Sequence, residues 1–323
     1  TRRAQGAASL RGSEEKMRAT WQDAWYAPAP AVRLAILRAT VGAFALMYLS
    51  IRFRSFTGMR SFEPWEFAPV GVVQTLSAPL PGQLVLLSVA LAIVLSALFM
   101  VGFRYRVVGP SFALLLLWIT SYRSSWGMLF HNDNLLCLHV LVLGVAPAAD
   151  AFSFDASRAR ERGRSLAQES HGRYGWPIRV LCLLALCTYV VAGIAKLKLA
   201  GLDWANGDTL RSQIAYDNLR KIELGSGSSA LGVWLLRHDW VFAPLAILSL
   251  LIELGAPLAL LSTRAALVWA SAAWCFHLGV ALLMHIPFHY PLSFVAFLPF
   301  FAVERGSETT AYRWLRGRWP ALP

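Results

Sequence analysis

The sequence has little charge for its length. Only 15% of its 323 residues are Asp, Glu, Lys or Arg, whereas 57% are hydrophobic and the mean hydropathy is +0.51. A soluble globular domain carries about 25% charged residues and a smaller apolar share, so the composition excludes that class. The chain is expected to be an all-α, polytopic membrane protein.

Cysteine is also scarce, and its placement excludes several classes of site. Cys137, Cys182, Cys187 and Cys275 all lie inside apolar runs without metal-ligand spacing. This placement favours small buried hydrophobic residues over a disulfide framework or a metal site. The sequence also lacks a phosphate-binding loop, a zinc-protease signature and a nucleophile elbow. No cleavage pattern precedes the first apolar run, so we expect no signal peptide.

Acidic residues are outnumbered by basic ones, 18 against 30, which gives a formal net charge of +12 and a pI near 10.1. Such an excess would suit a nucleic-acid partner. The arginines, however, gather in short segments between apolar runs, as topology signals do. We therefore expect the excess of basic residues to lie against the lipid bilayer, and we expect no nucleic-acid partner.

The apolar runs predict about eight membrane spans, because a spanning helix needs about 20 mostly apolar residues. The first run contains Arg33 and Arg38, which would have to snorkel or pair. The third and fourth runs are short and borrow flanking residues. The expected spans are 31–51, 84–103, 107–122, 134–149, 177–198, 240–263, 265–284 and 286–303.

Eight spans place both termini on one side of the membrane, and the arginine-rich links favour the cytoplasmic side. The loop 201–239 then faces outward, and we expect it to hold an amphipathic helix with Ile214, Leu219 and Ile222. The chain divides into a basic N-terminal tail with an interfacial segment (1–30), a transmembrane domain (31–303) and a basic C-terminal tail (304–323).

Lys196 is the foremost candidate for chemistry, because an ionisable residue at membrane depth is costly and marks function by default. A lysine held partly out of water in an apolar pocket loses preference for its charged form and can act as a base. Tyr189 and Gly193 precede it on roughly the same helix face. Gly193 would let a flat ligand or another helix approach. The alternative of an interfacial anchor fits Lys198 better than Lys196.

Glu253 is the only acid in its expected span. It would serve as a proton carrier or as the partner of Lys196 or Arg38, and we favour the structural ion pair. Asp133 suits a helix cap, whereas His131, two residues earlier, could help a substrate lose a proton.

A haem between helices is a weaker interpretation of the histidines. His277 and His285 are eight residues apart, about 80° off alignment on a helix. Pro287 interrupts the helix that would place His285 and His289 on one face. His139, His277 and His285 stay as weak candidates for haem ligands.

One part of the sequence resembles a known family. The run Ala192-Gly-Ile-Ala-Lys196-Leu, followed by Asp203-Trp204-Ala-Asn-Gly207, resembles vitamin K-dependent gamma-carboxylases and their bacterial HTTM-domain relatives. The resemblance extends from about residue 30 to 303. It includes Asn132-Asp133-Asn-Leu-Leu, Phe152-Ser-Phe-Asp-Ala and Phe276-His277.

The resemblance implies an enzyme in which Lys196 deprotonates a reduced quinone, menaquinone or vitamin K-like, to drive carboxylation or oxygenation. Such a base needs a dry apolar pocket. Asp203, Trp204 and Gly207 would form its outer rim, with His277 and Glu253 lining the pocket. Asn132 stands where the carboxylases have a histidine, beside His131. The chain lacks the large luminal domain of the eukaryotic enzymes. A bacterial inner membrane is the expected location.

A second function fits the same residues. The chain would then be a non-catalytic anchor subunit that binds a quinone, lipid or haem and holds a partner protein at its outer loops or within a redox complex. A transporter has less support, because no inverted repeat or pair of broken helices is evident.

Overall fold

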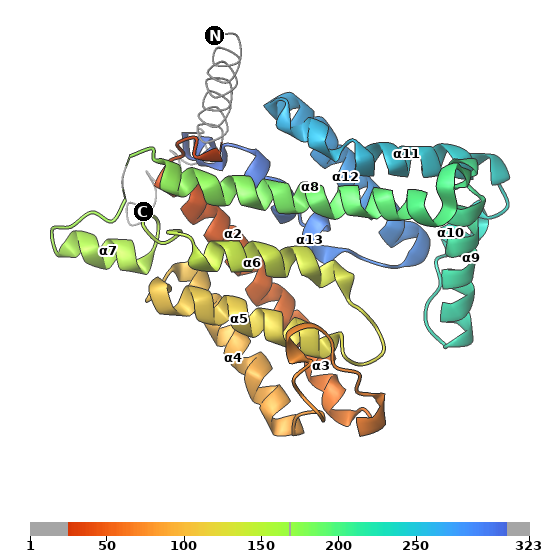
Figure 1. Cartoon of the computed structure of the whole chain (residues 1–323), viewed down its shortest axis with the longest axis horizontal. Coiled ribbons are helices and arrows are strands. Elements are labelled where there is room, and N and C mark those ends of the chain that lie inside the picture. Colours follow the sequence, from red (N-terminus) through yellow and green to blue (C-terminus); the bar gives the residue numbers. More distant parts are fainter. Residues whose placement is uncertain (1–24, 168, 309–323) are drawn as a thin grey trace, which may run out of the picture. The chain divides into compact units, whose positions relative to one another are not determined.

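The computed structural model describes residues 25–167 and 169–308, and these are predominantly helical (Figure 1). No strand longer than the isolated bridge between Ala29 and His171 occurs in these two ranges. The all-α prediction is confirmed. Most of the two expected basic tails lies outside the described residues.

The helices follow one another along the chain with short connections. The α-helices are α2 (Ala31–Ile51), α3 (Phe53–Thr57), α4 (Gly82–Val101), α5 (Tyr105–Arg123), α6 (Asn134–Val145), α7 (Phe154–Glu161), α8 (Gly172–Ala200), α9 (Asp208–Glu223), α10 (Ala230–Leu235), α11 (Phe242–Leu254), α12 (Thr263–Met284) and α13 (His289–Leu292). The 3₁₀ helices are η1 (Gly58–Ser61), η2 (Pro64–Glu66), η3 (Gly71–Val73), η4 (His131–Asp133), η5 (Gly201–Asn206), η6 (Asp239–Val241), η7 (Ala256–Leu260), η8 (Val295–Phe300) and η9 (Val303–Glu308).

Four helical segments of the described chain are long and apolar enough to cross a membrane. They are Ala31–Ile51, Gly82–Val101, Gly172–Asn206 and Thr263–Met284. They correspond to four of the eight expected spans. The remaining four expected spans fall on the shorter or less apolar helices α5, α6, α11 and α13, so the number of crossings stays a prediction.

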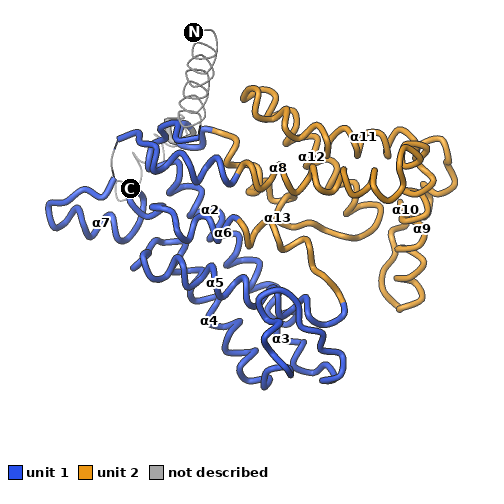
Figure 2. The backbone as a smooth tube through the Cα atoms, viewed as in Figure 1, with its two compact units in different colours: residues 1–127, 139–181, 302–323 blue, residues 128–138, 182–301 orange. Residues whose placement is uncertain are grey.

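Two compact units make up the structure, and Figure 2 colours them separately. Of the described residues, unit 1 comprises 25–127, 139–167, 169–181 and 302–308, and unit 2 comprises 128–138 and 182–301. Helices α6 and α8 contribute residues to both.

Unit 1 packs α2 against α4 and α4 against α5. Of the two α2 arginines, Arg33 forms an ion pair, whereas Arg38 donates a single hydrogen bond to a backbone carbonyl and its Nε and Nη1 have no partner among the described residues. Arg33 Nε donates to Glu304 Oε2 at 2.7 Å, and the buried Arg38 donates to the Phe152 carbonyl at 2.6 Å. The Phe-Ser-Phe-Asp-Ala run has a capping role, because Ser153 caps α7 and Asp155 accepts the first backbone N–H groups of α5.

Unit 2 has a core of aromatic and small residues from α8, α11, η7, α12 and η8. Tyr189, Trp269 and Phe297 form edge-to-face and tilted ring pairs at centroid distances of 5.1 to 6.3 Å. The small residues of α12 and η7 let these elements approach closely. The buried core residues are Leu186, Tyr189, Ile252, Ala256, Ala259, Ala266, Trp269, Ala270, Ala273 and Phe297.

The helix predicted in 201–239 exists as α9, in which Ile214 is buried and Leu219 and Ile222 are exposed. The expected burial of the cysteines needs correction, because Cys137 and Cys182 are buried but Cys187 and Cys275 are exposed. Exposed apolar side chains of this kind are ordinary at a protein surface.

Candidate functional site

A buried ion pair joins α8 to α11 in unit 2. Lys196, near the end of α8, places its Nζ 2.7 Å from Oε1 of Glu253. Ser249, one turn before Glu253 on α11, lies 3.4 Å from the same Nζ. The Glu253 side chain is 4% exposed and that of Lys196 is 19% exposed. Of the two partners that the sequence left open for Glu253, Lys196 is the one in contact.

Two aromatic rings enclose the lysine. Its Nζ lies 4.9 Å from the ring centroid of Trp204 and 5.3 Å from that of Phe276. A cation over an aromatic face gains about 0.5 to 2 kcal/mol, most where water is excluded. Trp204 is itself fixed, because its Nε1 donates to Ser249 Oγ at 3.2 Å. The charged end of Lys196 is therefore held in one position.

Two glycines allow α11 to approach the lysine-bearing segment. A Cβ on Gly193 would lie 2.8 Å from Leu254 Cδ2 and 3.1 Å from Glu253 Cβ. Gly207 has φ 89°, and a Cβ there would lie 2.4 Å from the backbone nitrogen of Ala243. At Gly207 the positive φ and the backbone contact leave room only for glycine, whereas a larger residue at 193 would require the side chains of Leu254 and Glu253 to move. The residues that carry the family resemblance thus form one packing surface for α11.

A second polar pair lies on α8 and α12 in the same unit. Tyr189 Oη and His277 Nε2 are 2.8 Å apart and buried. The His277 ring packs on Phe288 with centroids 4.8 Å apart, and Phe288 packs on His131 at 5.4 Å. A row of rings therefore connects the buried pair with the exposed His131.

Two buried polar atoms of this cluster lack a hydrogen-bond partner among the described residues. They are Oε2 of Glu253 and Nδ1 of His277. A buried polar atom without a partner costs about 1 to 3 kcal/mol. Such atoms are where a water molecule or a polar group of a ligand would be bound most favourably. The site thus consists of the Lys196–Glu253 ion pair and the Tyr189–His277 pair, and each pair has one buried polar atom that could bind a further polar group.

The other predicted residues lie outside this cluster or at its edge. Lys198 and Asp203 are exposed, so the structure distinguishes the two lysines. Asn132 is half-buried and Asp133 buried, both in η4. Sequence reasoning missed Ser249 and Phe288. The spacing of four residues between Ser249 and Glu253, which places both on one helix face, was the available signal for Ser249.

The haem candidates have protein contacts of their own. His139, in unit 1, is fully buried and its Nε2 lies 3.2 Å from the Leu181 carbonyl. His285 is exposed, with Nδ1 at 3.2 Å from the Gly227 carbonyl. Within the described ranges, no group of three or more His, Cys, Asp or Glu side chains is placed to hold a metal ion.

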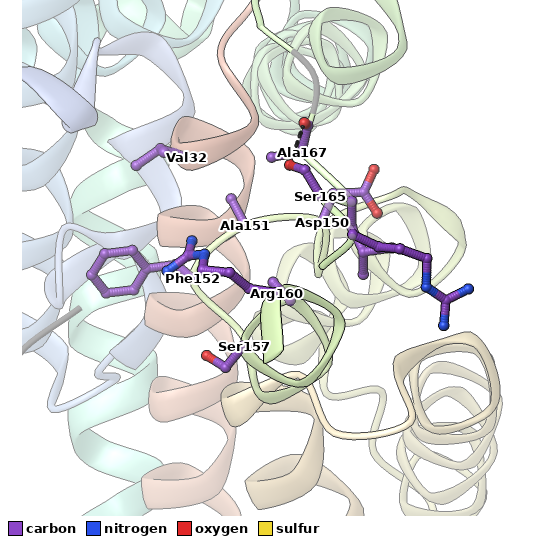
Figure 3. A pocket seen from close by; sticks show the side chains of 11 residues that line it. Val32, Asp150, Ala151, Phe152, Ser157, Arg160, Ser165 and Ala167 are labelled. Atoms are coloured by element: carbon purple, nitrogen blue, oxygen red, sulfur yellow. Dashed lines mark hydrogen bonds between the residues drawn. The ribbon is translucent and has the colours of Figure 1, made fainter. Parts of the chain in front are cut away.

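A cavity of about 190 Å³ lies in unit 1, between the start of α2 and the segment around α7. Figure 3 shows Arg160 and Ser157 at its wall beside Phe152. Asp150, also at the wall, is already bonded to the Tyr174 hydroxyl at 2.9 Å and to Arg173 at 2.9 Å. The arginines and serines of this cavity are exposed, so it is a solvent-facing hollow rather than a shielded site.

Comparison with known proteins gives one result. The family model of the HTTM domain matches residues 26–304, which confirms the resemblance seen in the sequence. No curated protein matches the chain, and no solved structure does.

Proposed function

Because the chain belongs to the HTTM domain family, we propose that it binds a reduced quinone, or a similar lipid with a ring hydroxyl, at the Lys196–Glu253 pair and takes a proton from it. The family is tied to the vitamin K-dependent carboxylases. The observation that carries the proposal is the buried pair itself, in which one carboxylate oxygen is bonded to lysine and the other lacks a partner.

The chemistry around the pair suits such a ligand. A ring hydroxyl is a hydrogen-bond donor and would satisfy Glu253 Oε2, while a flat ring suits the faces of Trp204 and Phe276. His277 Nδ1 offers a further position for a polar group. When bound, a reduced quinone supplies an acidic hydroxyl and the electrons for an oxygen-dependent carboxylation or oxygenation.

Proton transfer at the site starts from the contact between Lys196 and Glu253. A lysine in an ion pair is protonated and is no base. It becomes one when its proton passes to Glu253 along the 2.7 Å contact. The pair has no net charge before or after this step, and a neutral pair avoids the large cost of burying charges. Lys196 is then the base and Glu253 the group that holds its proton.

The test separates binding from turnover. Purified protein in lipid nanodiscs is titrated with 2-methyl-1,4-naphthohydroquinone under anaerobic conditions, and the quenching of tryptophan fluorescence is measured. We expect Lys196→Ala and Glu253→Gln to weaken binding at least about tenfold, the equivalent of about 1.4 kcal/mol. The matched control, Lys198→Ala, lies two residues away and is expected to bind as the native chain does.

Unchanged binding by Lys196→Ala would refute the assignment. Hydroquinone consumption is then followed with oxygen and carbon dioxide present. Binding without consumption would favour the non-catalytic anchor subunit over the enzyme, because both need the pocket and only the enzyme needs the base.

A further inference from the structure

Helix α9 has three distinct sides. Ile214, Asp217 and Asn218 are its buried residues and point toward the rest of unit 2. A second side carries Tyr216, Leu219 and Ile222, which are 69%, 55% and 55% exposed. Three-residue spacing places these three side chains within about 120° of the helix circumference. Exposed aromatic and branched side chains at this density are unusual for a surface in water.

The third side of α9 is polar. Gln213 is exposed and Arg220 half-buried, and both lie about 100° or more from Leu219, the centre of the apolar side. On the apolar side itself, the acids Asp208 and Glu223 stand only in the first and last turns. A helix divided in this way has its apolar and polar sides facing different media.

The orientation of α9 is fixed by bonds to the end of α12. The last carbonyl groups of a helix lack partners within it, and here side chains of the preceding segment 218–229 donate to them. Asn218 Nδ2 donates to the Leu283 carbonyl at 3.0 Å, and Lys221 donates to that of Met284. Asn218 Oδ1 also accepts the backbone N–H of Ser229 at 2.7 Å. Helix α9 therefore cannot rotate to hide its apolar side.

The position of α9 indicates what covers that side. It is bonded to the end of α12, a candidate membrane span, and in Figure 1 it runs across the direction of α8 and α11 of the same unit. A helix that crosses the end of a span lies along the membrane surface. Leu282, in the last turn of α12, is also exposed, so this end of the candidate span carries an apolar side chain at its surface. Aromatic residues such as Tyr216 are typical of this depth.

From these observations we infer that α9 is an interfacial helix that inserts Tyr216, Leu219 and Ile222 into the bilayer boundary while Gln213 stays in water. The occupant of the apolar side is lipid of the membrane for which α8 and α12 are candidate spans. An amphipathic helix of this kind buries its apolar side about 5 to 10 Å into the headgroup region. The inference is independent of the proposed chemistry at Lys196.

Spin labels test the inference. The exposed Cys187 and Cys275 are replaced by serine, while Cys137 and Cys182 stay, because they are buried and do not react. Single variants Leu219→Cys, Ile222→Cys and Gln213→Cys are labelled and placed in lipid nanodiscs. Electron paramagnetic resonance then measures collisions with oxygen, which concentrates in lipid, and with a water-soluble nickel chelate.

The expected result is a contrast between the two sides. Labels at 219 and 222 should collide more with oxygen, and the label at 213 more with the nickel chelate. Equal access of the chelate to 219 and 213 would overturn the inference, because it places the apolar side in water. A label at 219 that is immobile and reached by neither reagent would also overturn it, since protein would then cover that side. Thermal unfolding of each labelled variant confirms that the fold is kept.

Discussion

Replacement of Lys196 by methionine tests how much the fold depends on the ion pair between Lys196 and Glu253. Methionine keeps most of the length and apolar surface of lysine but leaves the Glu253 carboxylate, 4% exposed, without its counter-charge. Removal of one partner of a buried ion pair costs about 3 to 5 kcal/mol. Lys198→Met removes a lysine two residues away that is exposed, and a change at such a site stays within about 0.5 kcal/mol.

The two partners are not expected to be equivalent. Glu253→Gln leaves Lys196, which is 19% exposed and keeps its contacts with Ser249 and two aromatic rings. The Glu253→Gln variant should therefore lose less free energy of unfolding than Lys196→Met, about 1 to 3 kcal/mol. The double variant Lys196→Met/Glu253→Gln buries no charge, so it should lose less than the sum of the single variants. The expected coupling is about 1 to 3 kcal/mol, within the range for groups in contact.

The assay is reversible unfolding in mixed micelles, with sodium dodecyl sulfate as the denaturant and tryptophan fluorescence as the signal. Native chain, both single variants, the double variant and Lys198→Met are compared at one pH and one lipid content. The reasoning is refuted if Lys196→Met unfolds at the same denaturant fraction as Lys198→Met. Strict additivity in the double variant would refute the coupling even if each single variant is destabilised.

Three further predictions concern packing and pH. Gly207→Ala should lower the melting temperature sharply, because φ is 89° and the new Cβ would meet an α11 backbone nitrogen at 2.4 Å; unaltered melting would contradict this. Asn218→Ala should lower the free energy of unfolding by about 1 to 3 kcal/mol. Backbone amides where α10 meets the end of α12 should then exchange hydrogen faster, and unchanged exchange rates would contradict the hydrogen bonds of Asn218. Burial alone would raise the pKa of Glu304, but the hydrogen bond and charge of Arg33 outweigh it and lower the pKa below its ordinary 4.5. The pairing of Arg33 with ionised Glu304 therefore contributes its full stabilisation above about pH 4.5 and loses it as the pH falls through the lowered pKa. Thermal unfolding of Glu304→Gln should lack this dependence on pH.

Local signals in the sequence predicted local structure well. The first expected span, 31–51, coincides with α2, and Arg33 within it forms the ion pair that a charged residue in a span requires. The lysines 196 and 198 were told apart by helix position and by the glycine one turn before the first. These features depend on residues within one or two turns, where hydrophobic period and capping rules apply.

Features that depend on proline or on distant contacts were predicted less well. The expected span 286–303 contains Pro287, Pro291 and Pro299, and it forms only α13 and η8, separated by short irregular segments. Hydropathy counts the apolar residues of such a segment but not the backbone donors that proline removes. The partner of Glu253 also stayed open in the sequence, because Lys196 is 57 residues away and only tertiary packing brings them together.

The residues that carry the family resemblance pack on α11 in this structure, and this packing role has to be separated from the ligand role that we propose for them. Gly193, Lys196, Trp204 and Gly207 all contact α11, so each contributes to how this helix is held. Packing alone does not explain Glu253 Oε2, which is buried without a hydrogen-bond partner among the described residues. Loss of ligand binding in Lys196→Ala would follow either from a missing base or from a displaced α11. The double variant Lys196→Met/Glu253→Gln separates the two explanations. If its free energy of unfolding recovers but its affinity for the hydroquinone does not, the charge pair contacts the ligand. If the free energy of unfolding and the affinity both recover, the pair contributes to packing alone.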